Sequence, residues 1–400
     1  MTLDMVTPDE ALGIVLAHAP RLGAETVPLA EAVGGVLAEA VAADIDLPPF
    51  DKSAMDGYAV RRQDVARVPA DLAMIEELPA GAAPTRDLAP GACAKIMTGA
   101  PVPPGADVVI RVEDTEALPD GRVRILRAGV RPNICLRGED VRRGATVLEP
   151  GRVVGPAEIG VLASVGRERV AIGRRPRVAV LATGDELVPP GAIPGPGEIR
   201  DSNSFSLMAA CRRAGVPADL LGVARDNKAD LRAKIGEGLR RDVLLVSGGI
   251  SMGQWDLVPE VLEELGVAVR FAKVNMKPGK PTMFATHGER LVFGLPGNPV
   301  STLVAFRLFV WPALRKMMGH PQPAPPPIDA VLADKASVPG DRLSYVPADL
   351  QHQGDRWQAR AIETRGSADL VGFCRANALL VLDPGNYTPG TRVKAVPLEL

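Results

Sequence analysis

Glycines, carboxylates and small polar residues directly follow four apolar segments in the second half of the chain. The segment 178–182 leads into Thr183-Gly184-Asp185-Glu186. Glycine lets backbone N–H groups approach phosphate oxygens closely, and consecutive N–H groups form a concave anion-binding nest. Carboxylates beside such a nest would repel a bare phosphate, unless a hard cation such as Mg²⁺ joins them. The pattern therefore predicts a site for a phosphate-bearing ligand and a divalent cation.

The other candidate residues either follow an apolar segment in the same way or supply positive charge nearby. Lys277 and Lys280, in Lys-Pro-Gly-Lys-Pro, offer compact charges that would neutralise further phosphate. The predicted metal ligands are Glu186, Asp226 and Asp256. The predicted substrate-binding residues are Thr183, Gly184, Asp185, Ser247, Gly248, Gly249, Ser251, Gly253, Lys277, Lys280, Pro296, Gly297, Asn298 and Pro299.

Each of these segments also has a purely structural interpretation. Asparagine and aspartate are good helix caps, and any turn from a strand to a helix can use glycine. Four such strand ends in one sheet exceed what these interpretations explain, so we favour a binding site. The segments concerned are Asp226-Asn227 and Asp201-Ser202-Asn203 as caps, Gly248-Gly249 as a turn, and Lys277–Pro281 as a surface turn.

Three loops of the first half form a second candidate set. Asp56 lies beside a glycine in Ser53–Tyr58, Thr98 lies in a small polar loop, and Asp140 ends Arg-Gly-Glu-Asp. Taken one at a time, these loops are typical of ordinary turns.

The elements that would position the second-half residues alternate regularly between strand and helix. Near-continuous apolar strands with helices between them are typical of a parallel sheet covered on both faces. Ligands bind beyond the carboxyl ends of the strands in such sheets. The helices predicted here span 203–214, 230–240, 258–265 and 300–317.

The remainder of the chain predicts a multidomain α/β protein. Residues 8–20 and 27–41 have helical periodicity, as does a run from Pro156 to about Val165. Residues 47–140 are rich in Pro, Gly and short β-branched runs, which is typical of a mostly β domain. We therefore expect a helical linker domain (1–46 and 141–174), an inserted mostly-β domain (47–140), a doubly wound parallel-sheet domain (175–322) and a small C-terminal β domain (323–400).

Composition narrows the class of protein. The net charge of −2 gives no reason to expect a nucleic acid or an anionic membrane as partner. The N-terminus carries acids where a signal peptide would be basic, so the expected location is cytoplasmic. The four cysteines include no CxxC pair, which argues against a zinc cage and a disulfide scaffold.

Eight motifs occur together and in order along nearly the whole chain. They are SAMDGYAV (53–60), IMTGAPVP (96–103), RGED (137–140), TGDEL (183–187), DSN (201–203), SGGISMGQWD (247–256), KPGKP (277–281) and LPGNP (295–299). By these motifs the chain resembles the molybdopterin molybdenumtransferase family of the MoeA type, which is related to the gephyrin E domain.

The resemblance implies a four-domain homodimer whose third domain is the doubly wound, molybdopterin-binding one and whose fourth is β-barrel-like. It implies insertion of molybdate into adenylylated molybdopterin, with Mg²⁺ and release of AMP, and other proteins of cofactor synthesis as candidate partners. One departure is Asp226-Asn227, where the family often has two acids, so a two-carboxylate clamp is in doubt there. The positions tied to activity in the family are Asp56, Thr98, Asp140, Glu186, Asp226, Asp256, Lys277, Lys280, Pro296, Pro299 and Ser367.

Three alternatives stay open at this point. An adenylyltransferase of the preceding step would use the same doubly wound domain, but the 170 or so residues before it count against this reading. A non-catalytic scaffold like gephyrin would be expected to lose the strand-end acids, which are present here. Tungstate is a tetrahedral dianion of similar size, and no residue distinguishes it from molybdate.

Overall fold

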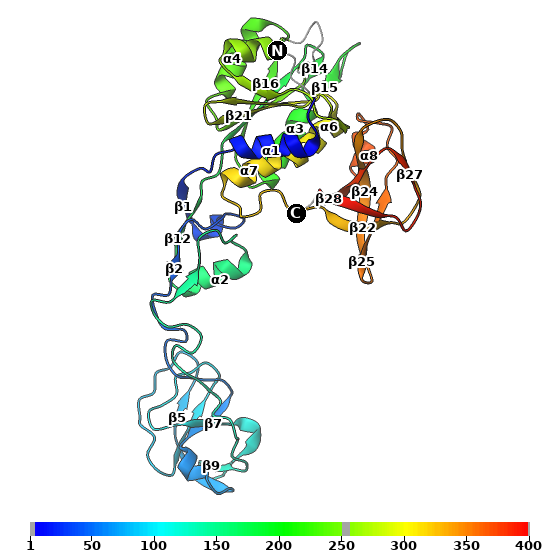
Figure 1. Ribbon diagram of the computed structural model, residues 1–400. Helices are drawn as coiled ribbons and strands as arrows, with labels where there is room; N and C mark the ends of the chain where they lie inside the picture. The colour runs from blue at the N-terminus through cyan, green and yellow to red at the C-terminus, as the bar shows by residue number, and fades with distance from the viewer. Residues whose placement is uncertain (1–4, 250–256, 399–400) are drawn as a thin grey trace. The chain divides into compact units, whose positions relative to one another are not determined.

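The computed structural model describes residues 5–249 and 257–398, which form two compact units (Figure 1). The first unit comprises Met1–Ala38, Gly151–Gly155 and Val170–Leu400, and the second comprises Glu39–Pro150 and Pro156–Arg169. Each unit is described by itself below.

The first unit is built around a six-stranded sheet with the strand order β16-β13-β17-β21-β20-β18. The first four strands of that order are parallel, as predicted, whereas β20 pairs antiparallel with both of its neighbours, β21 and β18. The antiparallel step arises because only Gly288 and Glu289 separate β20 from β21, and so short a turn can only join antiparallel strands. The strands are β13 (Val178–Thr183), β16 (Ala218–Ala224), β17 (Val243–Ser247), β18 (Ala268–Phe271), β20 (Met283–His287) and β21 (Arg290–Leu295).

Helices cover both faces of this sheet, which confirms the predicted α/β class (Figure 1). Side chains alternate between the two faces of a strand. Val178 and Val180 of β13 accordingly pack with α1, α3, α6 and α7, while Ala179 and Leu181 pack with α4 and α5. The helices are α1 (Pro8–His18), α3 (Asn203–Arg213), α4 (Lys228–Gly238), α5 (Val258–Glu264), α6 (Pro299–Ala305) and α7 (Trp311–Met317), with a π-helical segment (Phe306–Val310) between the last two.

The helix predicted for 27–41 is wrong. This stretch contains the end of β1 (Ala24–Pro28), a single 3₁₀ turn (Leu29–Glu31) and extended chain. Gly34 has φ +78°, and a Cβ on Gly35 would lie 2.8 Å from the Ile172 side chain. The Gly-Gly pair therefore breaks the helix that the Ala, Leu and Val spacing suggested. β1 pairs instead with β12 (Arg169–Gly173), so the expected helical linker is partly β.

The C-terminal part of the first unit is a closed barrel, as the resemblance implied. Its sheet has the order β19-β24-β25-β22-β28-β26, and a further pairing of β24 with β26 closes it. β19 (Met276–Lys277), which precedes β20 of the larger sheet, pairs with the start of β24 and carries Lys277 to the barrel. The barrel strands are β22 (Ile328–Leu332), β24 (Leu343–Gln353), β25 (Arg356–Ala361), β26 (Ala378–Leu382) and β28 (Arg392–Pro397). Beside them lie β23 (Ala336–Val338), β27 (Gly385–Tyr387) and α8 (Leu370–Phe373).

The second unit is mostly β, as predicted, and its main sheet has the order β7-β4-β6-β5-β9-β8. It also contains α2 (Pro156–Ser164), which matches the predicted helical run. The strands of the main sheet are β4 (Gly57–Val60), β5 (Ala70–Leu78), β6 (Ala92–Ile96), β7 (Val108–Arg111), β8 (Thr115–Ala117) and β9 (Arg122–Ile125). Short strands complete the unit: β2 (Val41–Ala42), β3 (Lys52–Ser53), β10 (Ile134–Cys135) and β11 (Thr146–Leu148).

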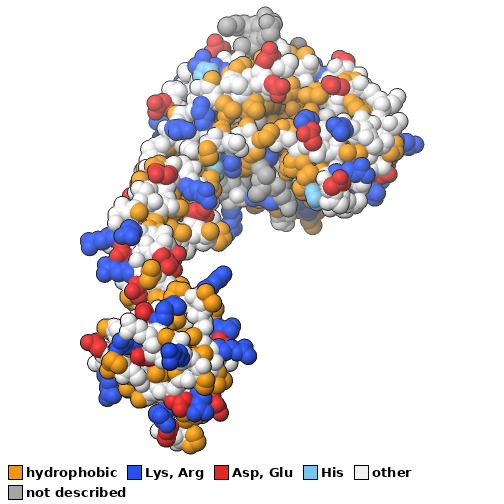
Figure 2. Space-filling model, turned by 60° about the horizontal axis from the view of Figure 1, so that its bottom comes forward, with side chains coloured by type: hydrophobic (Ala, Val, Ile, Leu, Met, Phe, Trp, Pro, Cys, Tyr) orange, Lys and Arg blue, Asp and Glu red, His pale blue; other side chains and the backbone are white. Residues whose placement is uncertain are grey.

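The surface agrees with the near-neutral composition. On the face seen in Figure 2, basic and acidic side chains are interspersed. Within the described ranges, no helix combines the length and the apolar character needed to cross a membrane.

Candidate active site

The four parallel strands of the first unit end in register, which brings their following loops to one edge of the sheet. Thr183 of β13 pairs with Ala224 of β16. Ala182 pairs with Ser247 of β17, and Ser247 pairs with Leu295 of β21. The predicted alignment of the loops that carry the site residues is therefore present.

Glycines in these loops are required by close packing as well as by backbone conformation. Gly248 and Gly249 have φ of +89° and +61°, a region that residues with a Cβ rarely adopt. A Cβ on Gly248 would lie 2.8 Å from the carbonyl oxygen of Thr183, and one on Gly249 would lie 2.5 Å from the Thr183 hydroxyl. The Thr183 hydroxyl is buried and has no hydrogen-bond partner among the described residues. The two glycines therefore let their loop pack directly against Thr183 at the end of β13.

Asn203, in the segment interpreted from sequence as a helix cap, joins two of the strand-end segments. Its Nδ2 donates to the Ser247 hydroxyl at 2.9 Å and to the Gly297 carbonyl at 2.7 Å. Its Oδ1 is buried without a partner in the described part of the chain. The cap interpretation holds for the neighbouring Asp201, whose carboxylate accepts from the Ser204 N–H at 3.0 Å. The Asp-Ser-Asn motif thus pointed to Asn203, but the sequence alone does not distinguish a helix cap from a residue that connects two strand ends.

Asp185 and Asp226 face each other across the ends of β13 and β16. The Asp185 N–H donates to the Asp226 carboxylate at 3.3 Å, and the Asp226 N–H donates to the Asp185 carboxylate at 3.4 Å. Asn227 caps α4 by accepting from the Asp230 N–H at 3.0 Å. The structural interpretation of Asp226-Asn227 is therefore right for Asn227, whereas both carboxylates remain exposed at the strand ends.

A cavity of about 780 Å³ lies between the strand ends and the barrel. Its wall includes predicted residues from four separate segments of the chain. Asn298 donates from Nδ2 to the Ser367 hydroxyl at 2.8 Å, which ties the loop after β21 to the barrel domain. The predicted residues that line the cavity are Glu186, Lys277, Lys280, Pro296, Gly297, Asn298 and Ser367.

The barrel contributes polar groups to this cavity that sequence reasoning missed. Arg342, Ser344, Tyr345 and Thr364 line it. Burial raises the pKa of the Tyr345 phenol, so this group is a neutral hydroxyl. None of these residues lies in a glycine-rich or acidic strand-end loop, and only the pairing of β19 with β24 shows that they adjoin Lys277.

The charge of the cavity wall favours an anion. Lys277, Lys280 and Arg342 are its cationic side chains, and Glu186 is its carboxylate. Among the described residues the wall carries three cations and one carboxylate, and counting Asp341, which pairs with Arg342 at 3.6 Å, the balance is still positive in a chain whose net charge is −2.

In the second unit, the structure brings together two of the three predicted loop residues. The backbone N–H and the hydroxyl of Thr98 both donate to one carboxylate oxygen of Asp56, each at 2.7 Å. These two hydrogen bonds, the backbone one first, hold the pKa of Asp56 below its usual value. Asp140 is exposed, and its N–H donates to the Leu47 carbonyl at 3.0 Å.

Part of the predicted set cannot be placed. Ser251, Gly253 and Asp256 lie outside the described residues. Within residues 5–249 and 257–398 there is no group of three or more side chains able to hold a metal. Since Asp256 belonged to the predicted ligand set of Glu186, Asp226 and Asp256, that set stays a prediction.

Three family models match successive parts of the chain. They are described as the MoeA N-terminal region (domain I and II) over residues 6–166, a probable molybdopterin binding domain over residues 179–316, and the MoeA C-terminal region (domain IV) over residues 329–398. Together they account for most of the sequence.

Full-length relatives and a solved structure agree with these models. Molybdopterin molybdenumtransferase 2 of Mycobacterium tuberculosis is 39% identical over 338 residues, covering 82% of this chain and 84% of the relative. Molybdopterin molybdenumtransferase of Bacillus subtilis is 33% identical over 399 residues, covering 97% and 93%. The crystal structure of a molybdopterin biosynthesis moea protein from Pyrococcus horikosii superposes with a TM-score of 0.81 at 33% identity, covering 99% of this chain and 100% of that one. The motifs, the fold and these similarities agree, and the chain belongs to the MoeA family of molybdopterin molybdenumtransferases.

Proposed function

We propose that this protein is a molybdenum insertase that takes adenylylated molybdopterin and molybdate, requires Mg²⁺ and releases AMP. The observation that carries the proposal is the cationic cavity of about 780 Å³ beside a glycine-rich strand-end edge. The two features supply separate places for a phosphate-bearing ligand and for a small oxyanion.

The strand-end edge suits the phosphate-bearing ligand. The N–H groups of Gly184 and Gly248 donate to the Ala224 and Leu295 carbonyls, so hydrogen bonds to a ligand at this edge are expected from side chains. The unpartnered hydroxyl of Thr183 and the unpartnered Oδ1 of Asn203 are buried at the same edge and can hydrogen-bond to a ligand.

The cavity suits molybdate. A tetrahedral dianion needs several donors at close range, and charge-assisted hydrogen bonds to it are the strong ones. Lys277, Lys280 and Arg342 supply the cations, and Ser367, whose hydroxyl accepts from the Asn298 amide, supplies a hydroxyl donor. Lysines in this setting neutralise the incoming oxyanion and hold it beside the strand ends, where the phosphate-bearing ligand is bound.

The residues present fit a magnesium ion. Asp185 and Asp226 offer carboxylate oxygens from two adjacent strand ends, and Mg²⁺ is commonly bound by one or two carboxylates together with substrate phosphates. Bound there, Mg²⁺ would neutralise phosphate charge that the two carboxylates would otherwise repel. Glu186 lines the cavity, so we place it nearer the oxyanion.

The test is incubation of the purified protein with adenylylated molybdopterin and molybdate, with and without a chelator. We expect AMP release and cofactor formation with Mg²⁺, and neither of them in excess chelator. Full product formation in the chelated sample would exclude the metal. Replacing molybdate by tungstate in the same assay tests which oxyanion the protein accepts.

A matched pair of variants separates a role in the site from a role in folding. Asp226 follows the carboxyl end of β16, and Asp219 lies near the opposite end of the same strand, where it pairs with Arg241. We expect Asp226→Asn to abolish AMP release and Asp219→Asn to leave it nearly unchanged. Equal loss in both variants would indicate damage to the strand rather than to the site.

A further inference from the structure

A second cavity, of about 720 Å³, lies at the edge of the large sheet where the parallel strands begin. Val178 at the start of β13 pairs with Ala218 of β16 and with Val243 of β17, so these strands begin in register. The cavity is lined by residues that directly precede these three strands, and it shares no residue with the cavity of the proposed active site. It is therefore a separate site at the opposite edge of the same sheet.

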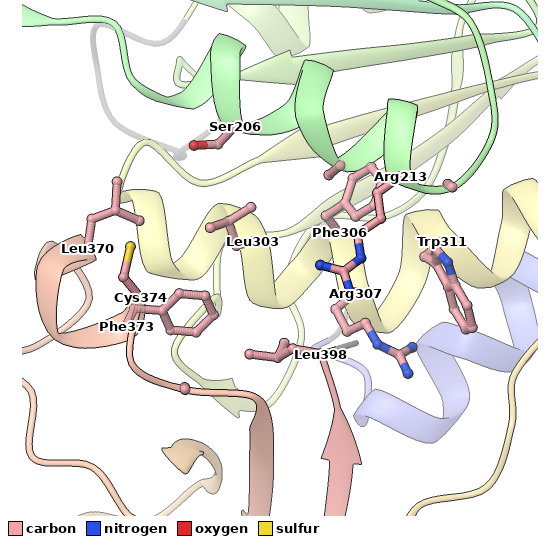
Figure 3. Close-up of a pocket in the computed structure, with 13 residues that line it drawn as sticks. Ser206, Arg213, Leu303, Phe306, Arg307, Trp311, Leu370, Phe373, Cys374 and Leu398 are labelled. Atoms are coloured by element: carbon pink, nitrogen blue, oxygen red, sulfur yellow. The ribbon is translucent and has the colours of Figure 1, made fainter. Parts of the chain in front are cut away.

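Arginine dominates the wall of this second cavity, which we call the arginine cavity. Six arginines line it, and they come from the segment before β13, the last turn of α3 and the segment between α4 and β17. They are Arg174, Arg175, Arg177, Arg212, Arg240 and Arg241. Figure 3 shows that Arg213, next to Arg212 on α3, lines a different and mostly apolar pocket, so Arg213 does not belong to this set.

Three of the six guanidinium groups are held by the fold. Arg174 donates to both carboxylate oxygens of Asp242, at 2.9 and 2.8 Å. Arg241 donates from Nε to the Asp219 carboxylate at 2.6 Å, and Arg175 donates to a backbone carbonyl at 2.6 Å. These hydrogen bonds give the cavity a fixed wall before any ligand binds.

The other three guanidinium groups are available to a ligand. The side chains of Arg177, Arg212 and Arg240 are exposed and make no hydrogen bond or ion pair with any residue of the ranges 5–249 and 257–398. Cations are favoured at helix C-termini, which accounts for Arg212 and Arg240 near the ends of α3 and α4. Arg177 precedes a strand, so no helix terminus accounts for its charge.

The charge balance of the arginine cavity is positive after the acids of its wall and of its ion pairs are counted. The wall contains Glu25, Glu31 and Asp242, and Asp219 outside the wall pairs with Arg241. Six arginines against these four carboxylates leave two positive charges, and each wall residue and its neighbours in sequence belong to the described ranges. Such an excess of one sign of charge in a cavity raises the local concentration of anions.

The composition of the wall also restricts the kind of anion. Apart from its charged residues, the wall consists of Gly215, Pro217 and two largely buried valines, Val27 and Val216. Among these described residues there is no aromatic ring on which a base could stack, and little apolar surface for a hydrophobic body. Recognition therefore depends on charge and on hydrogen bonds from guanidinium groups, which favours a compact polyanion.

We propose that the arginine cavity binds a compact oligophosphate, an anion of two or three linked phosphate groups. The planar guanidinium fork matches two phosphate oxygens in parallel hydrogen bonds. Arg177, Arg212 and Arg240 come from separate segments, so an anion with several phosphate groups can engage more of them at once than a single phosphate can. The volume of about 720 Å³ lies within the usual range of small-molecule sites. The proposal does not rest on the insertase activity, because the cavity is separate from the proposed active site.

Tripolyphosphate is the probe, and pyrophosphate and phosphate are the shorter members of the same series. Binding to the full-length protein would be measured by titration calorimetry without Mg²⁺, which complexes oligophosphates, and at low ionic strength, because salt screens exposed charges. We expect the affinity to rise from phosphate to pyrophosphate to tripolyphosphate. Citrate should bind more weakly than tripolyphosphate, because it carries less negative charge.

Variants assign the binding to the arginine cavity. Arg177→Gln and Arg212→Gln each remove one free guanidinium group and should weaken tripolyphosphate binding roughly tenfold, as expected for lost hydrogen bonds to a charged group. Their melting temperatures should match that of the parent protein, since neither side chain is hydrogen-bonded in the described part of the chain. Arg356→Gln, at an exposed position of β25 in the barrel, is the matched control and should bind as the parent protein does. Lys277→Gln tests whether the probe binds in the active-site cavity instead.

Several results would overturn the proposal. If tripolyphosphate does not bind, or binds no more tightly than citrate, the cavity is not an oligophosphate site. Loss of binding in Lys277→Gln but not in Arg177→Gln or Arg212→Gln would place the probe in the active-site cavity. Tighter binding of a glutamate-rich peptide, lost in Arg177→Gln, would identify the cavity as a docking site for an acidic segment of a partner protein. If Arg177→Gln changes the oligomeric state, this face is an interface between two copies of the chain.

Discussion

Asn203 offers the sharpest test of how the strand-end edge is assembled. Its side chain donates to the Ser247 hydroxyl and to the Gly297 carbonyl, so one amide group connects α3 with the loops that follow β17 and β21. Asn203→Ala removes both donors. Ser202→Ala is the matched control, since Ser202 is the preceding residue, is exposed and makes no capping hydrogen bond with its side chain.

The size of the effect follows from the lost hydrogen bonds. Each contributes a net of about 1 kcal/mol, and the Gly297 carbonyl and the Ser247 hydroxyl lose a donor as well. We therefore expect Asn203→Ala to lower the free energy of unfolding of the first unit by about 2 kcal/mol. For a unit of this size that corresponds to a fall in melting temperature of roughly 4–8 °C. Ser202→Ala should stay within about 0.5 kcal/mol of the parent protein.

The assay combines differential scanning calorimetry with binding of AMP, the product that the proposed reaction releases. The buried Oδ1 of Asn203 has no partner in the described part of the chain, and we expect it to accept a hydrogen bond from the nucleotide. Its loss should weaken AMP binding by roughly tenfold. If Asn203→Ala has the same melting temperature and the same AMP affinity as Ser202→Ala, the hydrogen bonds of Asn203 contribute neither to stability nor to binding, and the prediction is wrong. A lower melting temperature with unchanged AMP affinity would limit Asn203 to a structural role.

Three further predictions concern the other site residues. Glu186→Ala should reduce the rate of AMP release by roughly a hundredfold or more. The melting temperature should not change, because the side chain is exposed in the cavity wall. A loss of stability in proportion to the lost activity would contradict this prediction. Ser367→Ala removes a hydroxyl from the cavity wall together with the acceptor of the Asn298 amide. The molybdate concentration that gives half the maximal rate should therefore rise roughly tenfold, while the affinity for AMP stays the same. If the rate at limiting molybdate is unchanged, Ser367 does not belong to the site. In Thr98→Val the hydroxyl hydrogen bond to Asp56 is lost and the backbone one remains, so the pKa of Asp56 should rise part of the way to its usual value. A carboxylate with a lowered pKa stabilises the fold at pH values above that pKa, and this stabilisation is lost as the pH falls through it. In Thr98→Val the loss should therefore occur at a higher pH, and carbon-detected NMR of Asp56 can measure the change in pKa.

The strand ends were predictable because three independent signals agree in the sequence. Apolar segments of strand length, helices with period 3.6 and glycine or acid at each junction all indicate one parallel sheet. In such a sheet the carboxyl ends must meet at one edge, which places Thr183 beside Gly248 without any knowledge of side-chain packing. The antiparallel edge was not foreseen, because it depends on a two-residue turn at Gly288 and Glu289 rather than on the strands themselves.

The barrel side of the cavity could not be predicted from local patterns. Arg342 lies 65 residues after Lys277 in the sequence, and the two adjoin only because β19 pairs with β24. A long-range pairing of this kind leaves no periodic trace in either segment. The wrong helix at 27–41 has the opposite cause, since its apolar spacing was strong but the Gly-Gly pair and close packing on Ile172 override it.

The same few residues serve both the fold and the proposed chemistry at the strand-end edge. Gly249 must lack a side chain because its Cβ would lie 2.5 Å from the Thr183 hydroxyl, which is buried and has no hydrogen-bond partner among the described residues. Asn203 uses its amide N–H groups on Ser247 and Gly297, and its Oδ1 has no hydrogen-bond partner among the described residues. Buried polar atoms without partners are rare in folded proteins because each costs free energy. Two of them at one edge, each fixed by a neighbour that the fold requires, are best explained by a ligand that completes their hydrogen bonds.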